Sequence, residues 1–210
     1  MHDPTHKFEG TITPKTEKIA RLISLLGQPP FLSIPVFVSI CLVLSDDLTN
    51  GILCTVVCLL ASVAVPVAVT MIFSMRTGNE EKLDVVNKED RIIPMILGVV
   101  GYTIGAVILY LLEAPEIVTI LMVCYAVVTA ALTFITQYWK ISIHSCGVIG
   151  PSIGLGLAFC PWGFLYLLIW PPVVWSRYVL KKHTPLQLVM GAVAGFCLTA
   201  AIFCLMLGKI

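Results

Sequence analysis

Long runs of apolar residues constrain the fold of this chain more than any other feature of its sequence. A helix that crosses a bilayer needs about 20 apolar residues. The 210-residue chain is 58% hydrophobic and 12% charged, and it contains seven apolar segments. The segments run over residues 30–44, 51–74, 93–112, 117–138, 142–159, 162–175 and 186–207. We therefore expect an integral, multi-pass membrane protein whose fold is all-α, a polytopic helix bundle with about six to seven transmembrane helices.

The N-terminal region differs from the rest of the chain. Residues 1–15 are polar, and residues 16–27 alternate basic with apolar side chains. That alternation is typical of an amphipathic helix on the membrane surface, and it also fits the first turns of a longer helix. We expect a polar tail with an interfacial amphipathic helix at residues 1–28, followed by a single transmembrane domain at residues 29–210.

Basic residues are biased to one side of the expected membrane domain. Twelve of the thirteen lysines and arginines lie in the N-terminal region or in the loops after the second, fourth and sixth apolar segments. The opposite side holds Lys209 and four acidic residues, Asp46, Asp47, Glu113 and Glu116. By the positive-inside rule, the N-terminus and the basic face are expected to be cytoplasmic. A net charge of +1 without a basic and aromatic stripe gives no reason to expect a nucleic-acid partner.

Cysteine, proline and glycine residues occur within and between the apolar segments. The eight cysteines form no CxxC pair, so we expect small packing residues rather than disulfides or metal ligands. Pro66, Pro151 and the Pro171–Pro172 pair predict helix kinks, and residues 160–163 predict a tight turn. Glycines spaced four apart allow close helix packing without indicating an oligomer.

Three short polar interruptions hold almost all of the reactive side chains, at residues 84–91, 140–144 and 176–183. His144 and His183 lie in the second and third interruptions, each near a lysine or arginine. An even number of expected spans separates each interruption from the next, so all three are predicted to lie at one face. Charged groups at a membrane edge are costly unless they reach water or pair. Three such clusters at one face therefore indicate a shared anionic ligand.

The third interruption ends at a predicted helix start. Thr184 and Pro185 are typical of an N-cap and a first helical position, which places His183 directly before a helix N-terminus, where anions are stabilised. A neutral imidazole there can attack phosphorus if an acceptor holds its second nitrogen. The amide oxygen of Gln187 is a candidate for that acceptor, or Gln187 instead completes a capping box with Thr184. The sequence leaves both roles open.

The other candidate residues can surround a phosphate. His144 can give a proton to a leaving alkoxide, and Ser142 can hydrogen-bond a phosphoryl oxygen. Arg91 and Arg177 can each bind phosphate oxygens in a bidentate manner and stabilise the charge that grows during transfer. Two lysines are weaker candidates, because each can instead be a solvated charge that sets membrane orientation: Lys88 and Lys140.

The order and spacing of these residues resemble the type 2 phosphatidic acid phosphatase superfamily, whose members share a helical membrane core. The pattern of that family is a lysine, six residues and Arg-Pro, then Pro-Ser-Gly-His, then Ser-Arg, five residues, His, three residues and Asp. The resemblance covers roughly residues 84–195, about half of the chain.

The quality of the match differs among the three motifs. Arg91 matches the first arginine, while Asp84 stands at the lysine position and Pro94 lies two places late. Ser142 and His144 match the second motif, without its proline or glycine. The third motif matches at full spacing through Ser176, Arg177 and His183, with Gln187 where the family has aspartate.

The resemblance implies a metal-independent phosphatase, without a cofactor, that hydrolyses a membrane lipid phosphate or a polyprenyl (di)phosphate. His183 would be the nucleophile that forms a phosphohistidine, and His144 would protonate the leaving group. Arg91 and Arg177 would bind the phosphate. Gln187 in place of aspartate removes the negative charge that stabilises an imidazolium, so activity would be reduced or redirected.

Other classes of protein remain open. A lipid phosphotransferase would use another alcohol in place of water to discharge the phosphohistidine. A non-catalytic lipid-phosphate binder or transporter is favoured by the departures from the family pattern at Asp84 and Gln187. A magnesium-dependent enzyme similar to prenyltransferases would use Asp84, Glu89 and Asp90. It lacks a second aspartate-rich loop, because the acidic pair at residues 46–47 lies on the opposite face.

Overall fold

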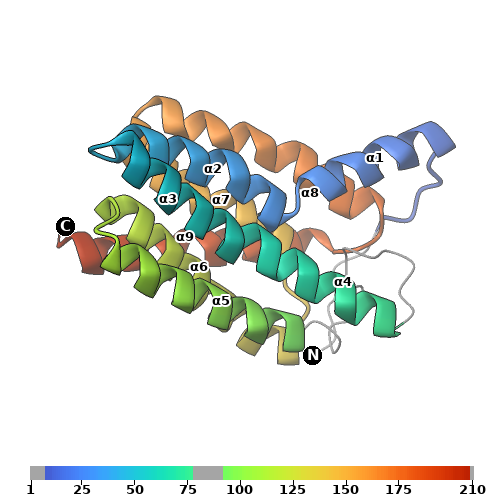
Figure 1. Ribbon diagram of the computed structural model, residues 1–210. Coiled ribbons are helices and arrows are strands. Elements are labelled where there is room, and N and C mark those ends of the chain that lie inside the picture. The colour runs from blue at the N-terminus through green and yellow to red at the C-terminus, as the bar shows by residue number, and fades with distance from the viewer. Residues whose placement is uncertain (1–7, 78–91, 209–210) are drawn as a thin grey trace.

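The computed structural model describes residues 8–77 and 92–208, which form helices with no strand among them (Figure 1). The helices are α1 (Pro14–Leu26), α2 (Pro29–Leu44), α3 (Leu48–Leu59), α4 (Val65–Thr77), α5 (Ile92–Leu111), α6 (Glu116–Tyr138), α7 (Ile143–Phe159), α8 (Trp170–Val179) and α9 (Pro185–Leu207). A π-helical turn, η1 (Leu60–Ala64), joins α3 to α4, and a 3-10 helix, η3 (Trp162–Ile169), leads into α8. The all-α fold expected from the sequence is confirmed.

Several of these helices are long enough to be membrane spans. Within the described ranges, four helical segments have the length and apolar character to cross a bilayer: Leu48–Arg76, Ile92–Leu111, Glu116–Tyr138 and Pro185–Leu207. The pair α1 and α2 makes a fifth if it is counted as one span bent by 50°. Helix α7 is apolar but shorter. The chain therefore has the helices of a multi-pass membrane protein, with four to five candidate spans. The six to seven transmembrane helices expected from the sequence stay a prediction.

The bundle has two ends that differ in charge. In Figure 1 the chain runs back and forth between them, and the turns at residues 45–47, 112–115 and 160–161 lie at the end where α9 finishes. The opposite end, which we call the basic end, holds α1, the last turn of α4 and the loops before α7 and α9. Its described lysines and arginines are Lys15, Lys18, Arg21, Arg76, Lys140, Arg177, Lys181 and Lys182.

Helix α1 lies at an angle to α2 and packs against α8 (Figure 1). It begins after Thr13, whose hydroxyl accepts a hydrogen bond from the backbone N–H of Thr16 at 3.2 Å. Small buried residues, Ala20 and Ser24, lie on one face. Its large apolar side chains are exposed on the other: Ile19, Leu22, Leu25 and Leu26. The sequence allowed a separate amphipathic helix or the start of a longer one, and the 50° bend separates α1 from α2.

Aromatic residues fill the middle of the bundle between α2, α5 and α6. The ring of Tyr125 lies 5.3 Å from that of Phe37 and 5.5 Å from that of Tyr102, centroid to centroid. Near the basic end, the hydroxyls of Ser33 and Ser62 hydrogen-bond at 2.8 Å and link α2 to η1. All eight cysteines are free thiols.

Helices α7 and α9 approach each other closely because α9 carries glycines at the contact. A Cβ atom added at Gly191 would lie 2.4 Å from the carbonyl oxygen of Ser142, and one at Gly195 would lie 2.9 Å from that of Cys146. A hydrogen bond from Ser145 also joins the two helices, since its hydroxyl donates to the carbonyl of Leu188 at 2.7 Å. The start of α7 and the first turns of α9 are therefore held together at the basic end.

This contact predicts a strong response to added volume at Gly191. We expect Gly191→Val to lower the free energy of unfolding by about 1–3 kcal/mol, because backbone atoms cannot move aside as a flexible side chain can. Thermal unfolding of the detergent-solubilised protein measures the change. Val193→Ala is the control, because Val193 lies on the same helix and is 44% exposed. Equal midpoints for the two variants would contradict this account of the packing.

Candidate functional site

The second polar interruption contacts, at the basic end, the helix that follows the third interruption. The backbone N–H of Ser142, just before α7, donates to the carbonyl of Gln187 in the first turn of α9 at 3.3 Å. A backbone hydrogen bond forms within the third interruption, where the N–H of Lys182 donates to the carbonyl of Arg177 at 3.0 Å. Residues that are remote in sequence are thus brought to one place by the ends of α7, α8 and α9.

His183 is completely buried beside the N-terminus of α9. Its Nδ1 lies 3.2 Å from Oε1 of Gln187, and the backbone N–H of Thr184 donates to the same oxygen at 3.2 Å. The backbone N–H of Gln187 donates in return to the hydroxyl of Thr184 at 3.4 Å. The two roles that the sequence left open for Gln187, orienting the imidazole and closing a capping box, are therefore both present.

These contacts also indicate which ring nitrogen carries a hydrogen. A backbone N–H can only donate, so the Gln187 atom that faces Thr184 must be the amide oxygen rather than the amide nitrogen. The same oxygen can only accept from Nδ1 of His183, which therefore carries the hydrogen. In the neutral imidazole the lone pair is then on Nε2, which is also buried. This tautomer is the one that a nucleophilic histidine needs.

Arg177 is a buried arginine in the last turn of α8, with a side chain only 1% exposed. Its Nη1 donates to the hydroxyl of Ser24 on α1 at 2.7 Å, across 153 positions of sequence. Nε and Nη2 of the guanidinium are buried as well. The side chain of Ser176 hydrogen-bonds within its own helix, since its hydroxyl donates to the carbonyl of Val173 at 2.8 Å.

The residues around His144 are arranged by the start of α7. Ser142 is the N-cap of this helix, and its hydroxyl accepts from the N–H of Ser145 at 3.3 Å. His144 follows in the first turn and is 6% exposed. Lys140 lies half-buried in the loop between α6 and α7. The hydroxyl of Ser142 can still donate its hydrogen while it caps the helix, so its expected contact with a phosphoryl oxygen stays a prediction.

Sequence reasoning missed two residues that organise this region. Ser24 holds Arg177, and Ser145 joins three helices by accepting from Nε1 of Trp170 at 2.7 Å while donating to α9. The available signal was weak: Ser24 interrupts the run Leu22-Ile23-Ser24-Leu25, and Ser145 directly follows His144. A serine inside an apolar run must hydrogen-bond when it is buried, but the sequence does not say to what.

The first interruption is not part of the described structure. Arg91, Lys88 and the acidic residues Asp84, Glu89 and Asp90 all lie outside the described residues. Its neighbours α4 and α5 end and begin at the basic end (Figure 1). In the described parts of the chain, no group of three or more His, Cys, Asp and Glu side chains could hold a metal ion. The metal-free phosphatase and the magnesium-dependent alternative therefore both stay predictions.

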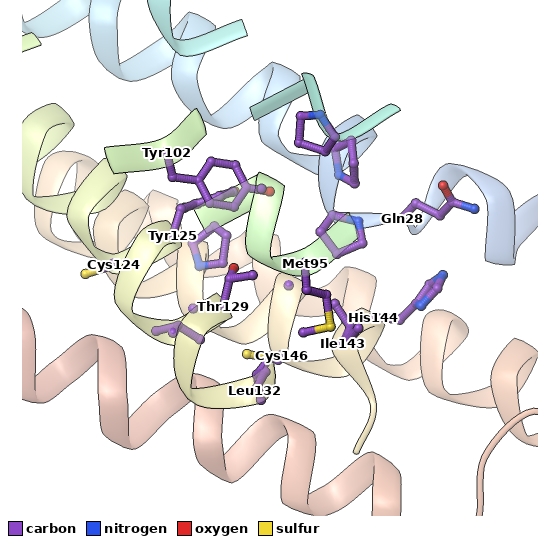
Figure 2. A pocket seen from close by; sticks show the side chains of 18 of the residues that line it. Gln28, Met95, Tyr102, Cys124, Tyr125, Thr129, Leu132, Ile143, His144 and Cys146 are labelled. Atoms are coloured by element: carbon purple, nitrogen blue, oxygen red, sulfur yellow. The ribbon is translucent and has the colours of Figure 1, made fainter. Parts of the chain in front are cut away.

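A cavity of about 180 Å³ begins at this site and extends into the bundle. Figure 2 shows His144 and Gln28 at one end of it, with Tyr102 and Tyr125 toward the other. Its walls come from α2, α4, α5, α6, α7 and α9, and most of the lining is apolar. Of the histidines and arginines described above, His144 is the one that lines it.

Comparisons with protein-family models, with curated proteins and with solved structures found no match.

Proposed function

We propose that this protein is a metal-independent membrane phosphatase that hydrolyses a lipid phosphate or polyprenyl (di)phosphate through a phosphohistidine on His183. The observation that carries the proposal is the pair of 3.2 Å contacts to Oε1 of Gln187, from Nδ1 of His183 and from the N–H of Thr184. They favour the imidazole tautomer whose Nε2 can attack phosphorus. The N-terminus of α9 supplies the positive end of a helix dipole beside it.

The reaction has two steps. In the first, the lone pair of Nε2 forms a bond to phosphorus, the bond from phosphorus to the ester oxygen breaks, and protonated His144 gives its proton to the leaving alkoxide. In the second, His144 takes a proton from water, the oxygen attacks phosphorus, and the bond to Nε2 breaks. Inorganic phosphate leaves together with the free alcohol from a phosphate monoester, or with the polyprenyl monophosphate from a diphosphate, and both histidines return to their starting states.

Cationic groups would bind the phosphate during both steps. Arg177 is buried and anchored by Ser24, so its guanidinium is held in a fixed direction before the substrate arrives. In the proposal, Arg91 is the second guanidinium, while Lys88 or Lys140 replaces the charge of the family's lysine. Ser142 would donate its hydroxyl hydrogen to a phosphoryl oxygen.

The membrane arrangement in the proposal follows from the same residues. The core is similar to that of the type 2 phosphatidic acid phosphatases, with six to seven spans if α2, α7 and the η3–α8 segment also cross the bilayer. The basic end and the N-terminus face the cytoplasm, in accord with the positive-inside rule. Helix α1 lies at the interface, with its exposed apolar side chains in contact with lipid.

A non-catalytic lipid-phosphate binder is the second candidate, and Gln187 is the observation that favours it. A neutral amide stabilises the cationic phosphoimidazolium less than a carboxylate would, so turnover is slower than in a site with aspartate. A lipid phosphotransferase would form the same phosphohistidine and pass it to an alcohol. Activity that EDTA abolishes would instead support the magnesium-dependent alternative.

The Gln187→Asp variant tests the role of this amide. We expect turnover equal to or faster than that of the wild type, because a carboxylate can accept from Nδ1 of His183 and also stabilise the imidazolium by charge. The assay is phosphate release from phosphatidate, phosphatidylglycerol phosphate and polyprenyl diphosphates, all presented in the same mixed micelles. Gln187→Leu, which removes both contacts, is the matched control and is expected to lose activity. A clear loss in the aspartate variant would show that the amide has a specific task that charge cannot replace.

A further inference from the structure

The cavity that starts at His144 lies in the interior of the bundle, where a membrane protein has few reasons to leave space. Lining residues on α6 run from Leu121 to Leu132, a rise of roughly 16 Å, and those on α7 run from His144 to Pro151, roughly 10 Å. A volume of about 180 Å³ is far larger than a single water requires. The cavity therefore extends from the basic end toward the middle of the helix bundle as an elongated, mainly apolar space.

The chemistry at His144 indicates what this space holds. In the proposed reaction His144 protonates the leaving oxygen, and that oxygen is attached to the organic part of the substrate rather than to the released phosphate. The substrate group bonded to the leaving oxygen must therefore begin beside the His144 imidazole. His144 is itself part of the cavity wall, so the path of this group leads into the cavity.

We propose that the cavity is the binding site for the first part of one hydrocarbon chain of the substrate, the chain bonded through the leaving oxygen. This assignment rests on the proposed function. It names the substrate class as an ester of phosphate with a long, apolar alcohol. The rings of Tyr102 and Tyr125 lie at the inner end (Figure 2) and pack against each other, and Phe37 packs against Tyr125. Because these rings are held by one another, they limit how far a chain can enter.

Gly98 offers a way to fill the cavity without disturbing the backbone. It lies on α5 in the cavity wall, and the three atoms nearest to a Cβ atom added there would all belong to the side chain of Tyr102, the first at an ordinary 3.6 Å. A leucine at this position is therefore expected to fold and to occupy the space. Val100, two residues on, is 49% exposed and outside the cavity, so Val100→Leu is the matched control. Thr129→Leu places added volume in the facing wall from α6 and repeats the test independently.

The experiment measures chain binding directly. A dodecyl phosphate with a photoreactive diazirine at the end of its chain is added to the full-length protein in detergent. The mixture is irradiated, and mass spectrometry maps the residues into which the diazirine has inserted. We expect insertion at the inner wall, at Tyr102, Cys124 and Tyr125. Labelling there is expected to fall by about tenfold in Gly98→Leu and Thr129→Leu, since at least two methylene groups lose their site, and to be unchanged in Val100→Leu. Insertion on the lipid-facing side of α5, at Val107 and Ile108, equal in all variants, would overturn the proposal.

Phosphate release from the same variants separates this inference from the proposed function. Gly98→Leu is expected to lower the ratio of release from dodecyl phosphate to release from p-nitrophenyl phosphate by about tenfold, because a short ester does not fill the cavity. Val100→Leu is expected to leave both rates unchanged. Suppose that no ester is hydrolysed, but the cavity residues are still labelled and Gly98→Leu blocks the labelling. The assignment of the chain-binding site is then supported and the proposed phosphatase activity is wrong. If the esters are hydrolysed but the diazirine does not label the cavity residues, the proposed phosphatase activity is supported and the assignment of the cavity as the chain-binding site is wrong.

Discussion

Replacing His183 with alanine is expected to lower phosphate release at least about a thousand-fold, to the background of the assay. His183 combines burial, a hydrogen bond to Gln187 that leaves the lone pair on Nε2, and a place at a helix N-terminus. Alanine removes the atom that bonds to phosphorus, so binding of the substrate cannot restore the reaction. The measurement is release of inorganic phosphate from long-chain lipid phosphates in mixed micelles, with wild-type and variant protein purified side by side.

A control variant at the same helix start separates chemistry from local unfolding. Thr184→Ala removes the capping hydroxyl and is expected to destabilise the protein by about 1 kcal/mol. It leaves the imidazole and the backbone N–H that orients Gln187. Its activity is therefore expected to fall far less than that of His183→Ala. Retained turnover in His183→Ala would refute the assignment of the nucleophile, and equal losses in both variants would show that the helix start, rather than the imidazole, is what matters.

Replacing Arg177 with lysine is expected to lower kcat/KM by about a hundred-fold, the second largest effect among these predictions. The guanidinium is a planar donor that can bind two phosphoryl oxygens while its Nη1 stays on the hydroxyl of Ser24 at 2.7 Å. An ammonium group is a single compact charge on a flexible stem and cannot do both. Steady-state kinetics on one lipid phosphate, with the folded state checked by thermal unfolding, measure the effect.

Ser24 provides the matched comparison for Arg177, because changing it leaves the charge in place. Ser24→Ala removes only the acceptor that holds Nη1, so we expect a loss of about three- to tenfold in kcat/KM. Ser24→Thr keeps a hydroxyl and is expected to restore activity. Wild-type kinetics in Arg177→Lys would show that Arg177 contributes no more than positive charge. A Ser24→Ala variant that is unstable but fully active would show that this contact serves only the fold.

Most of the helices could be predicted from the sequence because apolar length is a local property. The start of α9 is the clearest case, since Thr184 and Pro185 specify an N-cap and a first helical position without help from the rest of the chain. The tight turn at residues 160–161 also lies where Pro161 and Gly163 indicated it. The Pro171–Pro172 pair was expected to kink a helix. In the structure it opens the first turn of α8, because proline fits there without losing a hydrogen bond.

The tertiary contacts of the candidate site could be predicted only in outline. Counting spans placed the second and third interruptions at one face, and the hydrogen bond from Ser142 to Gln187 joins the second interruption to the first turn of α9, just after the third. The hydrogen bond from Arg177 to Ser24 joins residues 153 positions apart and follows no local pattern. The cavity depends on side chains from six helices at once, so no single segment of sequence indicates it. The dual role of Gln187 needed atomic positions, because either contact alone satisfies the sequence pattern.

The central claim is that Nε2 of His183 forms a covalent bond to the phosphorus of a lipid phosphate. Brief reaction with a lipid carrying a radioactive phosphate, followed by alkaline quenching and peptide mapping, tests it directly, because a phosphohistidine survives base and is lost in acid. The account predicts a base-stable label on the peptide that contains His183, formed equally in EDTA and absent from His183→Ala. Phosphate release that proceeds with no such label, or with the label on another residue, would contradict it.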